Sequence, residues 1–446
     1  MQGMNLQQLR DAALAIAHAA IRAVDPEALI HKSVRLEGDR LIIGATNIAL
    51  SEFRRIIVVG AGKASASMAR ALETILGNRI AGGSIVVKDG HTRSLQRIEV
   101  IEAAHPVPDE RGVSAARKLI GLLKENARRD TLVLCLISGG GSALMPLPAE
   151  GLSLNDKQAM TRLLLECGAS IDEVNIVRKH ISGIKGGQLA RAAAPARVCT
   201  LLLSDAVGDA PDVIASGPTV GDPSTFSDAK AVMEKYNIWH RVPKSVANFI
   251  QSGVNGEIKE TPKPDDEIFR NVSNDIIGNN RSALIAASEK AVSLGFRPLI
   301  LSACISGEAR EVGTVFASIA LETANSHNPI APPACILAGG ETTVTIRGKG
   351  KGGRNQELAL SAALKLAKSG NIVLASVGTD GTDGPTDAAG AVVDTTTVER
   401  ARKHGLDPVA YLQRNDSYNL LEPIGDLLKT GPTGTNVMDL LITLVG

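Results

Sequence analysis

The stretch RIIVVGAGKASASMARALETIL, residues 55–76, decides the fold class that we expect for the chain. Its opening residues, Arg55–Val59, are mostly apolar and β-branched, which is typical of a buried strand. The turn Gly60–Ser65 follows, and Ser67–Leu76 has the apolar spacing of a helix. A strand, a Gly-x-Gly turn and a helix in this order form the front of a nucleotide-binding βαβ unit, so the stretch predicts an α/β fold.

Lys63 is the first candidate functional residue, because it lies in this turn at the start of the helix. Gly60 and Gly62 allow backbone N–H groups to approach an anion, and the helix N-terminus adds a favourable dipole. Lys63 would then hold a phosphate as a point charge; the alternative is a lysine that faces solvent. Ser65 replaces the third glycine of a dinucleotide fingerprint, but Asp89 lies where such enzymes bind a ribose hydroxyl. An oxidoreductase therefore stays open at this point.

A second glycine-rich turn follows Thr131–Ile137, a wholly apolar run typical of a central parallel strand buried on both faces. Three consecutive glycines with flanking serines make a backbone nest for an anion, and the alternative is a tight turn without a ligand. The residues of this candidate nest are Ser138, Gly139, Gly140, Gly141 and Ser142.

Other polar residues follow expected strands in the same half of the chain. His105 lies in a turn with two prolines, where it either contacts substrate or makes a structural hydrogen bond. Asp205 follows the strand Val198–Leu203 and is a candidate metal or ribose ligand, or a cap. Arg178 and Lys185, on and just after a helix with a basic side, could face the same pocket or water.

The passage AGGETTVTIRGKGKGGRNQELAL, residues 338–360, carries the clearest charge pattern. Thr342–Ile346 is rich in β-branched residues and predicts a strand entered through a hairpin-like turn. Residues 347–354 then hold four cations and four glycines, which cannot pack as a core. Arg354 at a helix start could hold a phosphate or carboxylate through two hydrogen bonds; the alternative is a flexible basic loop. Further candidate binding residues in the passage are Glu341 and Asn355.

Acidic residues follow the next apolar strand, Ile372–Ser376. Asp380, Asp383 and Asp387 cluster at its end, where open α/β sheets place ligands. Mg²⁺ usually lies between one or two carboxylates and substrate phosphates, so Asp380 and Asp205 are candidate metal ligands; the alternative is an Asp-Gly turn without a metal. A basic anion loop and an acidic strand end together indicate phosphoryl transfer.

Composition limits the other classes of protein. The 446 residues suffice for two or three domains, and we expect domains at 1–242 and 271–446 joined by a linker region at 243–270. Lys plus Arg number 48 against 47 acids, and aromatic residues make up only 2%, which argues against nucleic-acid binding.

No membrane association or export is expected either. No signal peptide is visible at the N-terminus, and no uncharged apolar run reaches the roughly 18 residues that a membrane span needs. Five widely spaced cysteines are typical of buried thiols in a reducing compartment, so we expect the cytoplasm.

Together these loops resemble the glycerate 2-kinase family, whose C-terminal half is called the MOFRL domain. The resemblance covers nearly the whole chain, and nine short motifs in the same order make it specific. They are Val59-Gly-Ala-Gly-Lys-Ala64, His105-Pro-Val-Pro-Asp109, Ile137-Ser-Gly-Gly-Gly-Ser-Ala143, Arg178-Lys-His-Ile-Ser182, Leu203-Ser-Asp205, Ser216-Gly-Pro218, Gly339-Gly-Glu-Thr342, Gly352-Gly-Arg-Asn-Gln-Glu357 and Gly378-Thr-Asp-Gly-Thr-Asp-Gly-Pro385.

The resemblance implies an activity and a set of partners. It implies phosphorylation of the 2-hydroxyl of D-glycerate by ATP with Mg²⁺ or another divalent cation, with Lys63 and Arg354 as the catalytic residues. It also implies a cleft between two α/β domains. The N-terminal domain would be Rossmann-like, with a mostly parallel sheet and helices on both faces, and the C-terminal MOFRL-type domain would be smaller. Some family members are labelled hydroxypyruvate reductases, which keeps an NAD(P)H-dependent reductase as the alternative, and a homodimer is an option.

Overall fold

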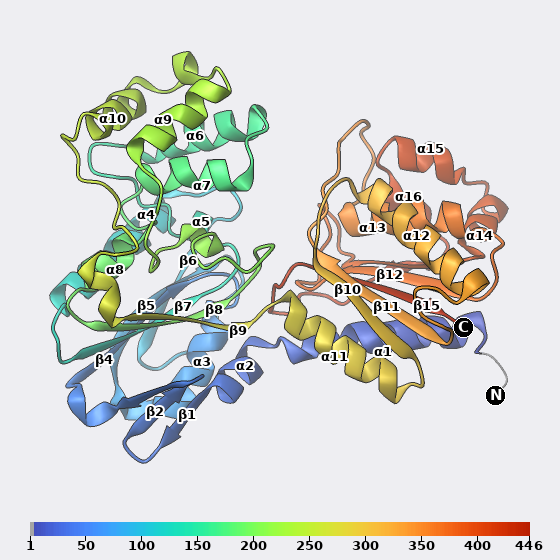
Figure 1. Cartoon of the computed structure of the whole chain (residues 1–446), viewed down its shortest axis with the longest axis horizontal. Coiled ribbons are helices and arrows are strands. Elements are labelled where there is room, and N and C mark those ends of the chain that lie inside the picture. The colour runs from blue at the N-terminus through green and yellow to red at the C-terminus, as the bar shows by residue number, and fades with distance from the viewer. Residues whose placement is uncertain (1–3) are drawn as a thin grey trace. The chain divides into compact units, whose positions relative to one another are not determined.

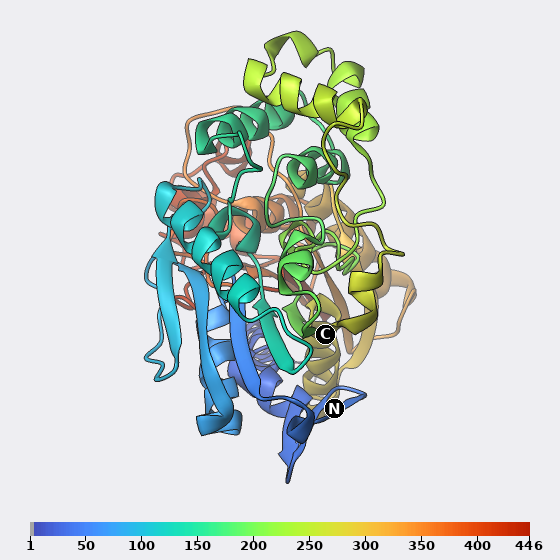
Figure 2. The same cartoon turned by 90° about the vertical axis from the view of Figure 1, so that its left-hand side faces the viewer.

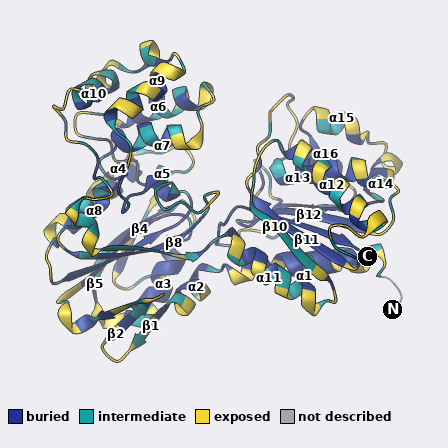
Figure 3. Cartoon of the chain, in the orientation of Figure 1, coloured by how far each residue is buried: buried dark blue, intermediate teal, exposed yellow. Residues whose placement is uncertain are grey.

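The computed structural model describes residues 4–446, which form two compact units (Figure 1). One unit combines the N-terminal segment up to Asp25 with Gly278–Gly446, and the other is Pro26–Ile277. Each contains a six-stranded sheet with helices packed on it, and the strands of both sheets are largely buried (Figure 3). The predicted α/β class with two α/β domains is confirmed.

The sheet of the Pro26–Ile277 unit has the order β6-β5-β4-β7-β8-β9, and β4 to β8 pair in parallel. The chain runs from β4 outward through β5 to β6, then returns to β7 on the other side of β4 and continues to β8. The direction therefore reverses between β4 and β7, which is where doubly wound sheets bind ligands. The strands are β4 (Arg55–Ala61), β5 (Ile80–Lys88), β6 (Ile98–Ala103), β7 (Thr131–Ile137), β8 (Arg197–Leu203) and β9 (Val272–Gly278).

Helices cover both faces of this sheet because its strands are apolar on both sides. All seven residues of β7 are buried. Val133, Cys135 and Ile137 share a core with α4 (Glu110–Glu125) and α8 (Gln188–Ala193), while α3 (Ser65–Leu76) packs on the other face (Figure 1). A small antiparallel sheet with the order β1-β2-β3, built from Val34–Glu37, Arg40–Ile43 and Thr46–Ala49, lies beside α3.

Four helices form a separate cluster with its own apolar core inside the same unit. They gather at one end of the cartoon in both Figure 1 and Figure 2 and are α6 (Leu154–Glu166), α7 (Ile171–His180), α9 (Phe226–Lys235) and α10 (Lys244–Val254). We predicted a linker region at 243–270, but its first part forms helix α10 of this cluster. Gly253 of α10 packs so closely on Phe226 that an added Cβ would lie 2.2 Å from the ring.

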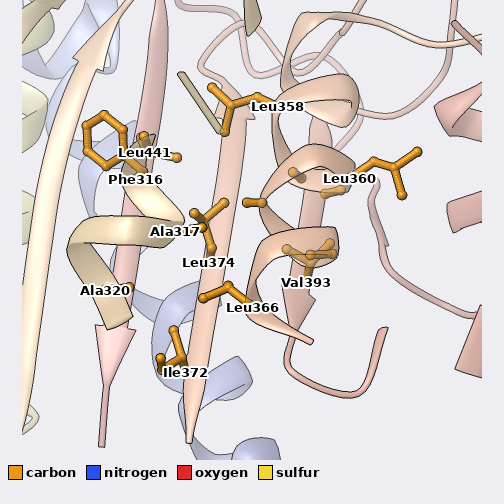
Figure 4. Close-up of a cluster of buried hydrophobic side chains, with 14 of the residues drawn as sticks. Phe316, Ala317, Ala320, Leu358, Leu360, Leu366, Ile372, Leu374, Val393 and Leu441 are labelled. Atoms are coloured by element: carbon orange, nitrogen blue, oxygen red, sulfur yellow. The ribbon is translucent and has the colours of Figure 1, made fainter. Parts of the chain in front are cut away.

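The second unit has a mixed sheet with the order β10-β11-β15-β12-β13-β14. Its strands are β10 (Arg297–Ile305), β11 (Ala334–Gly340), β12 (Ile372–Gly378), β13 (Gly390–Asp394), β14 (Leu427–Leu428) and β15 (Asp439–Val445). The helices α12 (Ala309–Ser326) and α13 (Arg354–Leu366) pack against each other and on this sheet. Figure 4 shows Leu358 and Leu366 of α13 and Phe316 of α12 in a core with Leu374 and Leu441 of the sheet.

The N-terminal helix α1 (Leu6–Ala23) belongs to this second unit, together with α11 (Asn280–Ser293). Its apolar face is buried, and α1 contacts β12 and β15. Arg10 donates to Asp394 at 2.5 Å and to Asp426 at 2.7 Å, which fastens the helix by charge as well. The predicted boundaries of 1–242 and 271–446 differ from this division, because α1 packs with the C-terminal sheet and residues 271–277 extend the N-terminal one.

Two smaller expectations are wrong. The predicted strand at Thr342–Ile346 does not form; Thr343 makes only an isolated bridge with Glu308, whose carboxylate also accepts from the Thr345 backbone N–H. A β-branched run becomes a strand only beside a neighbour with which it can pair. Cys304 is exposed, although all five cysteines are free as expected. Among residues 4–446, no helix is both long and apolar enough to span a membrane.

Candidate active site

The two glycine-rich turns of the N-terminal unit form one joined structure at the point where the strand order reverses. β4 and β7 pair in parallel register along their whole length, so the turns leave the sheet side by side. The Lys63 N–H donates to the carbonyl of Gly139 at 2.9 Å, and the Ser138 N–H donates to the carbonyl of Ala61 at 3.1 Å. The Ser138 hydroxyl accepts from the Ala64 N–H at 3.0 Å. These bonds hold Lys63 beside the predicted anion nest.

Glycine is required at two positions of these turns. Gly62 has a φ of +144°, and a Cβ there would lie 2.1 Å from the Ser138 hydroxyl oxygen. Gly140 has a φ of +84°, and its Cβ would lie 3.0 Å from the His105 ring and 3.5 Å from Cγ of Lys63. The structure therefore brings the half-buried Lys63 and His105 together at Gly140. Gly60, near the end of β4, and Gly141, the first residue of the short helix α5 (Gly141–Leu144), are both buried.

Ser142, at the end of the nest, belongs to a polar network that reaches the helical cluster. The Lys185 ammonium donates to the Ser142 hydroxyl at 2.6 Å and to the Ser142 carbonyl at 2.7 Å. The Ser142 hydroxyl also lies 3.1 Å from the Ser216 hydroxyl, which donates to the Asn175 side-chain oxygen at 2.9 Å. Ser216 lies in one of the motifs that carry the resemblance but was not a candidate site residue, and nothing in the local pattern marks Asn175.

Lys185 and Arg178 lie close enough to repel each other. Burial, and after it the charges of neighbouring cations that include Arg178, lower the pKa of Lys185 well below its ordinary value. Arg178, in the last turn of α7, is half-buried, and burial lowers its pKa too. The two candidates therefore belong to one cationic region next to Ser142. Asp205 is half-buried two residues beyond β8, at the edge of the sheet where β4 and β7 also end.

The second unit holds Arg354 as the first residue of α13, between two carboxylates. Its Nε and Nη2 atoms donate to the two carboxylate oxygens of Asp439 at 2.6 and 3.0 Å, and Nη1 donates to Glu341 at 2.5 Å. A guanidinium has five N–H groups, so two remain for a ligand. Burial, opposed by the charge of Arg354, raises the pKa of Asp439 to about 6. Nothing in the sequence pattern marks Asp439, which is the first residue of the apolar strand β15.

Asn355 and Asp383 shape the start of α13. The buried Asn355 side chain accepts from the Ser376 hydroxyl at 2.6 Å, and its backbone N–H donates to Asp383 at 3.1 Å. Asp383 also accepts from the Gln356 N–H at 2.9 Å, so this carboxylate caps the helix. A cavity of about 20 Å³ lies against Asn355 and Asp439, enough for a single water molecule.

The other acids of this loop also have protein partners. The Asp380 carboxylate accepts from the backbone N–H and the hydroxyl of Thr382, both at 3.0 Å, as in a polar turn. Asp387 accepts from the Tyr418 hydroxyl at 2.7 Å. Within residues 4–446, no three His, Cys, Asp or Glu side chains gather in a set that could hold a metal by themselves. Asp205 and Asp380, the two candidate ligands, lie in different units.

Comparisons with known proteins cover the whole chain. A family model described as a domain of unknown function, DUF4147, matches residues 12–251, and the MOFRL family model matches residues 334–439. The chain is 44% identical over 443 residues to a glycerate 2-kinase of Pyrococcus horikoshii, covering 99% of this chain and 98% of that protein. It is also 44% identical to a D-glycerate 2-kinase of Thermotoga maritima, over 98% of this chain and 99% of the relative.

Solved structures agree with the sequence matches. The crystal structure of a glycerate kinase from Thermotoga maritima superposes with a TM-score of 0.86 at 42% identity, covering 99% of this chain and 100% of that one. A relative from Agrobacterium vitis, 45% identical over 88% of this chain and 87% of its own length, carries hydroxypyruvate reductase as a provisional name.

Proposed function

The chain belongs to the glycerate 2-kinase family, and from this premise we propose that it transfers the γ-phosphoryl group of ATP to the 2-hydroxyl of D-glycerate. The products are 2-phospho-D-glycerate and ADP. The observation that carries the proposal is the meeting of Lys63, His105 and the glycine nest at the point where the strand order reverses. That position is where a doubly wound sheet offers backbone N–H groups to an anionic ligand.

We assign to Lys63 the neutralisation of negative charge on the transferring phosphoryl group. Phosphoryl transfer needs little covalent help from the protein; it needs positioning and neutralisation of charge on the equatorial oxygens. Lys63 lies beside the start of α3 and is fixed through its backbone to Gly139, so its ammonium extends from a rigid turn. His105, on the other side of Gly140, is placed to contact the same ligand.

Arg354 is the second residue that we assign to catalysis. Its orientation is set before any substrate arrives, because Asp439 and Glu341 together occupy three of its N–H groups. The remaining two N–H groups, one on each terminal nitrogen, can donate to a phosphate or carboxylate. A double-mutant cycle between Lys63→Ala and Arg354→Ala tests whether both act on one step, since losses on a shared step are not additive.

A divalent cation fits the polar residues at the carboxyl ends of the strands in the Pro26–Ile277 unit. Mg²⁺ takes one or two protein carboxylates and completes its shell with phosphate oxygens and water, so Asp205 is the residue that would hold it with ATP. When bound, the ion neutralises phosphate charge. Asp380 is the weaker candidate, because its carboxylate already closes a turn with Thr382.

The test is a coupled assay of ADP release with D-glycerate and with L-glycerate. An enolase-linked readout separates 2-phosphoglycerate from 3-phosphoglycerate. ADP release with D-glycerate and formation of the 2-phosphate support the proposal. NADH consumption with hydroxypyruvate, in the absence of ADP release from glycerate, would replace the kinase by the reductase.

A further inference from the structure

Three cations lie close enough to repel one another at the side of the helical cluster that Lys185 joins to Ser142. They are Lys157 of α6, Arg178 of α7 and Lys185 of the following turn. Lys157 is 6% exposed and Lys185 is 3% exposed, which is rare for lysine unless a partner neutralises it. Among residues 4–446, no carboxylate forms an ion pair with any of the three, and the charges that act on the two lysines come only from the group itself.

Hydrogen bonds connect the two lysines through one turn. The Lys157 ammonium donates to the carbonyl of Leu147 at 3.1 Å, and the Ser182 hydroxyl donates to the same carbonyl at 3.1 Å. The Ser182 hydroxyl oxygen accepts from the Lys185 N–H at 3.3 Å. The Lys185 ammonium in turn bonds Ser142 of the nest. The cationic group is therefore continuous with the candidate active site.

A neighbouring lysine shows how this fold treats a buried structural cation. Lys179, next to Arg178 on α7, lies 3.0 Å from the carboxylate of Asp212 and 3.6 Å from that of Asp222. Among the other acids on these helices, Asp156 of α6 binds Ser153 and Ser245, and Glu173 of α7 binds Lys235. The fold thus supplies carboxylates to Lys179 and none to the three cations, although burying an unpaired charge is costly.

We propose that Lys157, Arg178 and Lys185 form a binding site for a substrate oxyanion, either the carboxylate of the hydroxy acid or a phosphate of the nucleotide. Lys157 is the new member of the site. This site proposal depends on the proposed function in one respect: the kinase reaction supplies the two candidate anions, glycerate and the nucleotide. Arg178 offers the planar pair of donors that a carboxylate or phosphate accepts, and the lysines add charge from the buried side.

Anion binding to this group is coupled to protons. Burial, with the charge of Arg178, lowers the pKa of Lys157 to about 7, and burial with the charges of Lys157 and Arg178 lowers the pKa of Lys185 well below its ordinary value. A bound anion favours the charged ammonium and raises both values, so the complex takes up protons near neutral pH. A lysine whose only role is to hold the Leu147 carbonyl would not produce this uptake.

The test is calorimetric titration of the full chain with D-glycerate alone and with ADP alone. Each titration is run at pH 7.5 in two buffers with different ionisation enthalpies, which gives the number of protons taken up. We expect one of the two ligands to bind with proton uptake. Lys157→Gln should weaken that ligand by ~10-fold or more and reduce the uptake, while the other ligand binds as before. Lys124→Gln, a change at an exposed lysine of α4, is the matched control and should alter neither.

The outcomes separate this site from the kinase assignment. Unchanged affinity for both ligands in a folded Lys157→Gln protein overturns the site, whether or not the wild type releases ADP. If Lys157→Gln weakens binding but the wild type shows no kinase activity, the anion site is supported and the kinase assignment is refuted. If Lys157→Gln does not fold, Arg178→Gln at a half-buried position gives the same test, and unchanged affinity there also overturns the site.

Discussion

Replacing Asp439 with asparagine should separate stability from activity in the C-terminal unit. Burial raises the pKa of this carboxyl from its ordinary 3.8 to about 6, even though Arg354 opposes the shift. Between these pH values the folded state binds more protons than the unfolded state, so the stability that Asp439 contributes is complete below about pH 4 and is lost as pH rises through about 6. A difference of about 2 pH units corresponds to roughly 3 kcal/mol.

Asp439→Asn removes this dependence while it keeps the shape and one acceptor oxygen. The difference in free energy of unfolding, wild type minus variant, should fall by roughly 3 kcal/mol between pH 4 and pH 7. Because asparagine resembles the protonated Asp439, the two proteins should be about equally stable at pH 4 and the variant should be the more stable one at pH 7.5. Its kcat should nevertheless fall by ~10–100-fold, because Arg354 loses one of its two bonds to residue 439 and its orientation loosens.

Urea denaturation at several pH values and the ADP-release assay measure the two effects. Asp407→Asn is the control for the loss of one negative charge, since this exposed residue caps α15 (Pro408–Gln413) and asparagine is also a good cap. A wild type minus variant difference that stays flat from pH 4 to pH 7 would refute the reasoning, and so would a variant with wild-type kcat.

Four further substitutions, one of them a control, test other parts of the two units. Lys63→Ala should lower kcat by ~100-fold or more in the ADP assay with little change in the thermal midpoint, and a wild-type kcat would contradict its role. Gly140→Ala and Gly151→Ala, at φ values of +84° and +85°, should each cost about 1 kcal/mol in urea unfolding. Only the change at Gly140 should lower kcat/KM, because its Cβ meets His105 while that of Gly151 meets open space; equal activities would refute this contact. Asp383→Ala should lower the free energy of unfolding by ~2 kcal/mol through loss of the α13 cap, and an unchanged urea midpoint would exclude the cap.

The candidate site of the Pro26–Ile277 unit was predictable because its signals are local. A glycine turn at the end of an apolar strand predicts both the backbone geometry and the edge of the sheet where it lies. Parallel pairing of β4 and β7 then brings Lys63 to the Ser138 turn, as the sequence pattern suggests. Lys157 was missed for the opposite reason: a lysine within a helix usually faces solvent, and only the packing of α6 over Leu147 buries it.

The candidate residues of the C-terminal unit show the limit of composition as a guide. The acids after β12 suggested a metal, but Asp383 is turned back to cap α13 and Asp380 closes its own turn. A cap and a metal ligand use the same residue type at a strand end, so the sequence cannot separate them. Asp439 lies 85 residues from Arg354 along the chain, and only the pairing of β15 with β11 and β12 places it at the start of α13.

The balance of charge differs between the region around Arg354 and the region around Lys157 and Lys185. The two regions should therefore act differently on a bound anion. Arg354 meets two carboxylates, Asp439 and Glu341, so its charge is already compensated and it serves a ligand chiefly as a directional donor. Lys157 and Lys185 have no carboxylate partner within residues 4–446, so any net positive charge there is compensated only by what binds. A transferring phosphoryl group needs both orientation and neutralisation. Under the proposed function, we therefore expect neutralisation from Lys63 and a divalent cation, and we expect Arg354 chiefly to orient its ligand. Lysine at position 354 would therefore restore the charge without restoring the function.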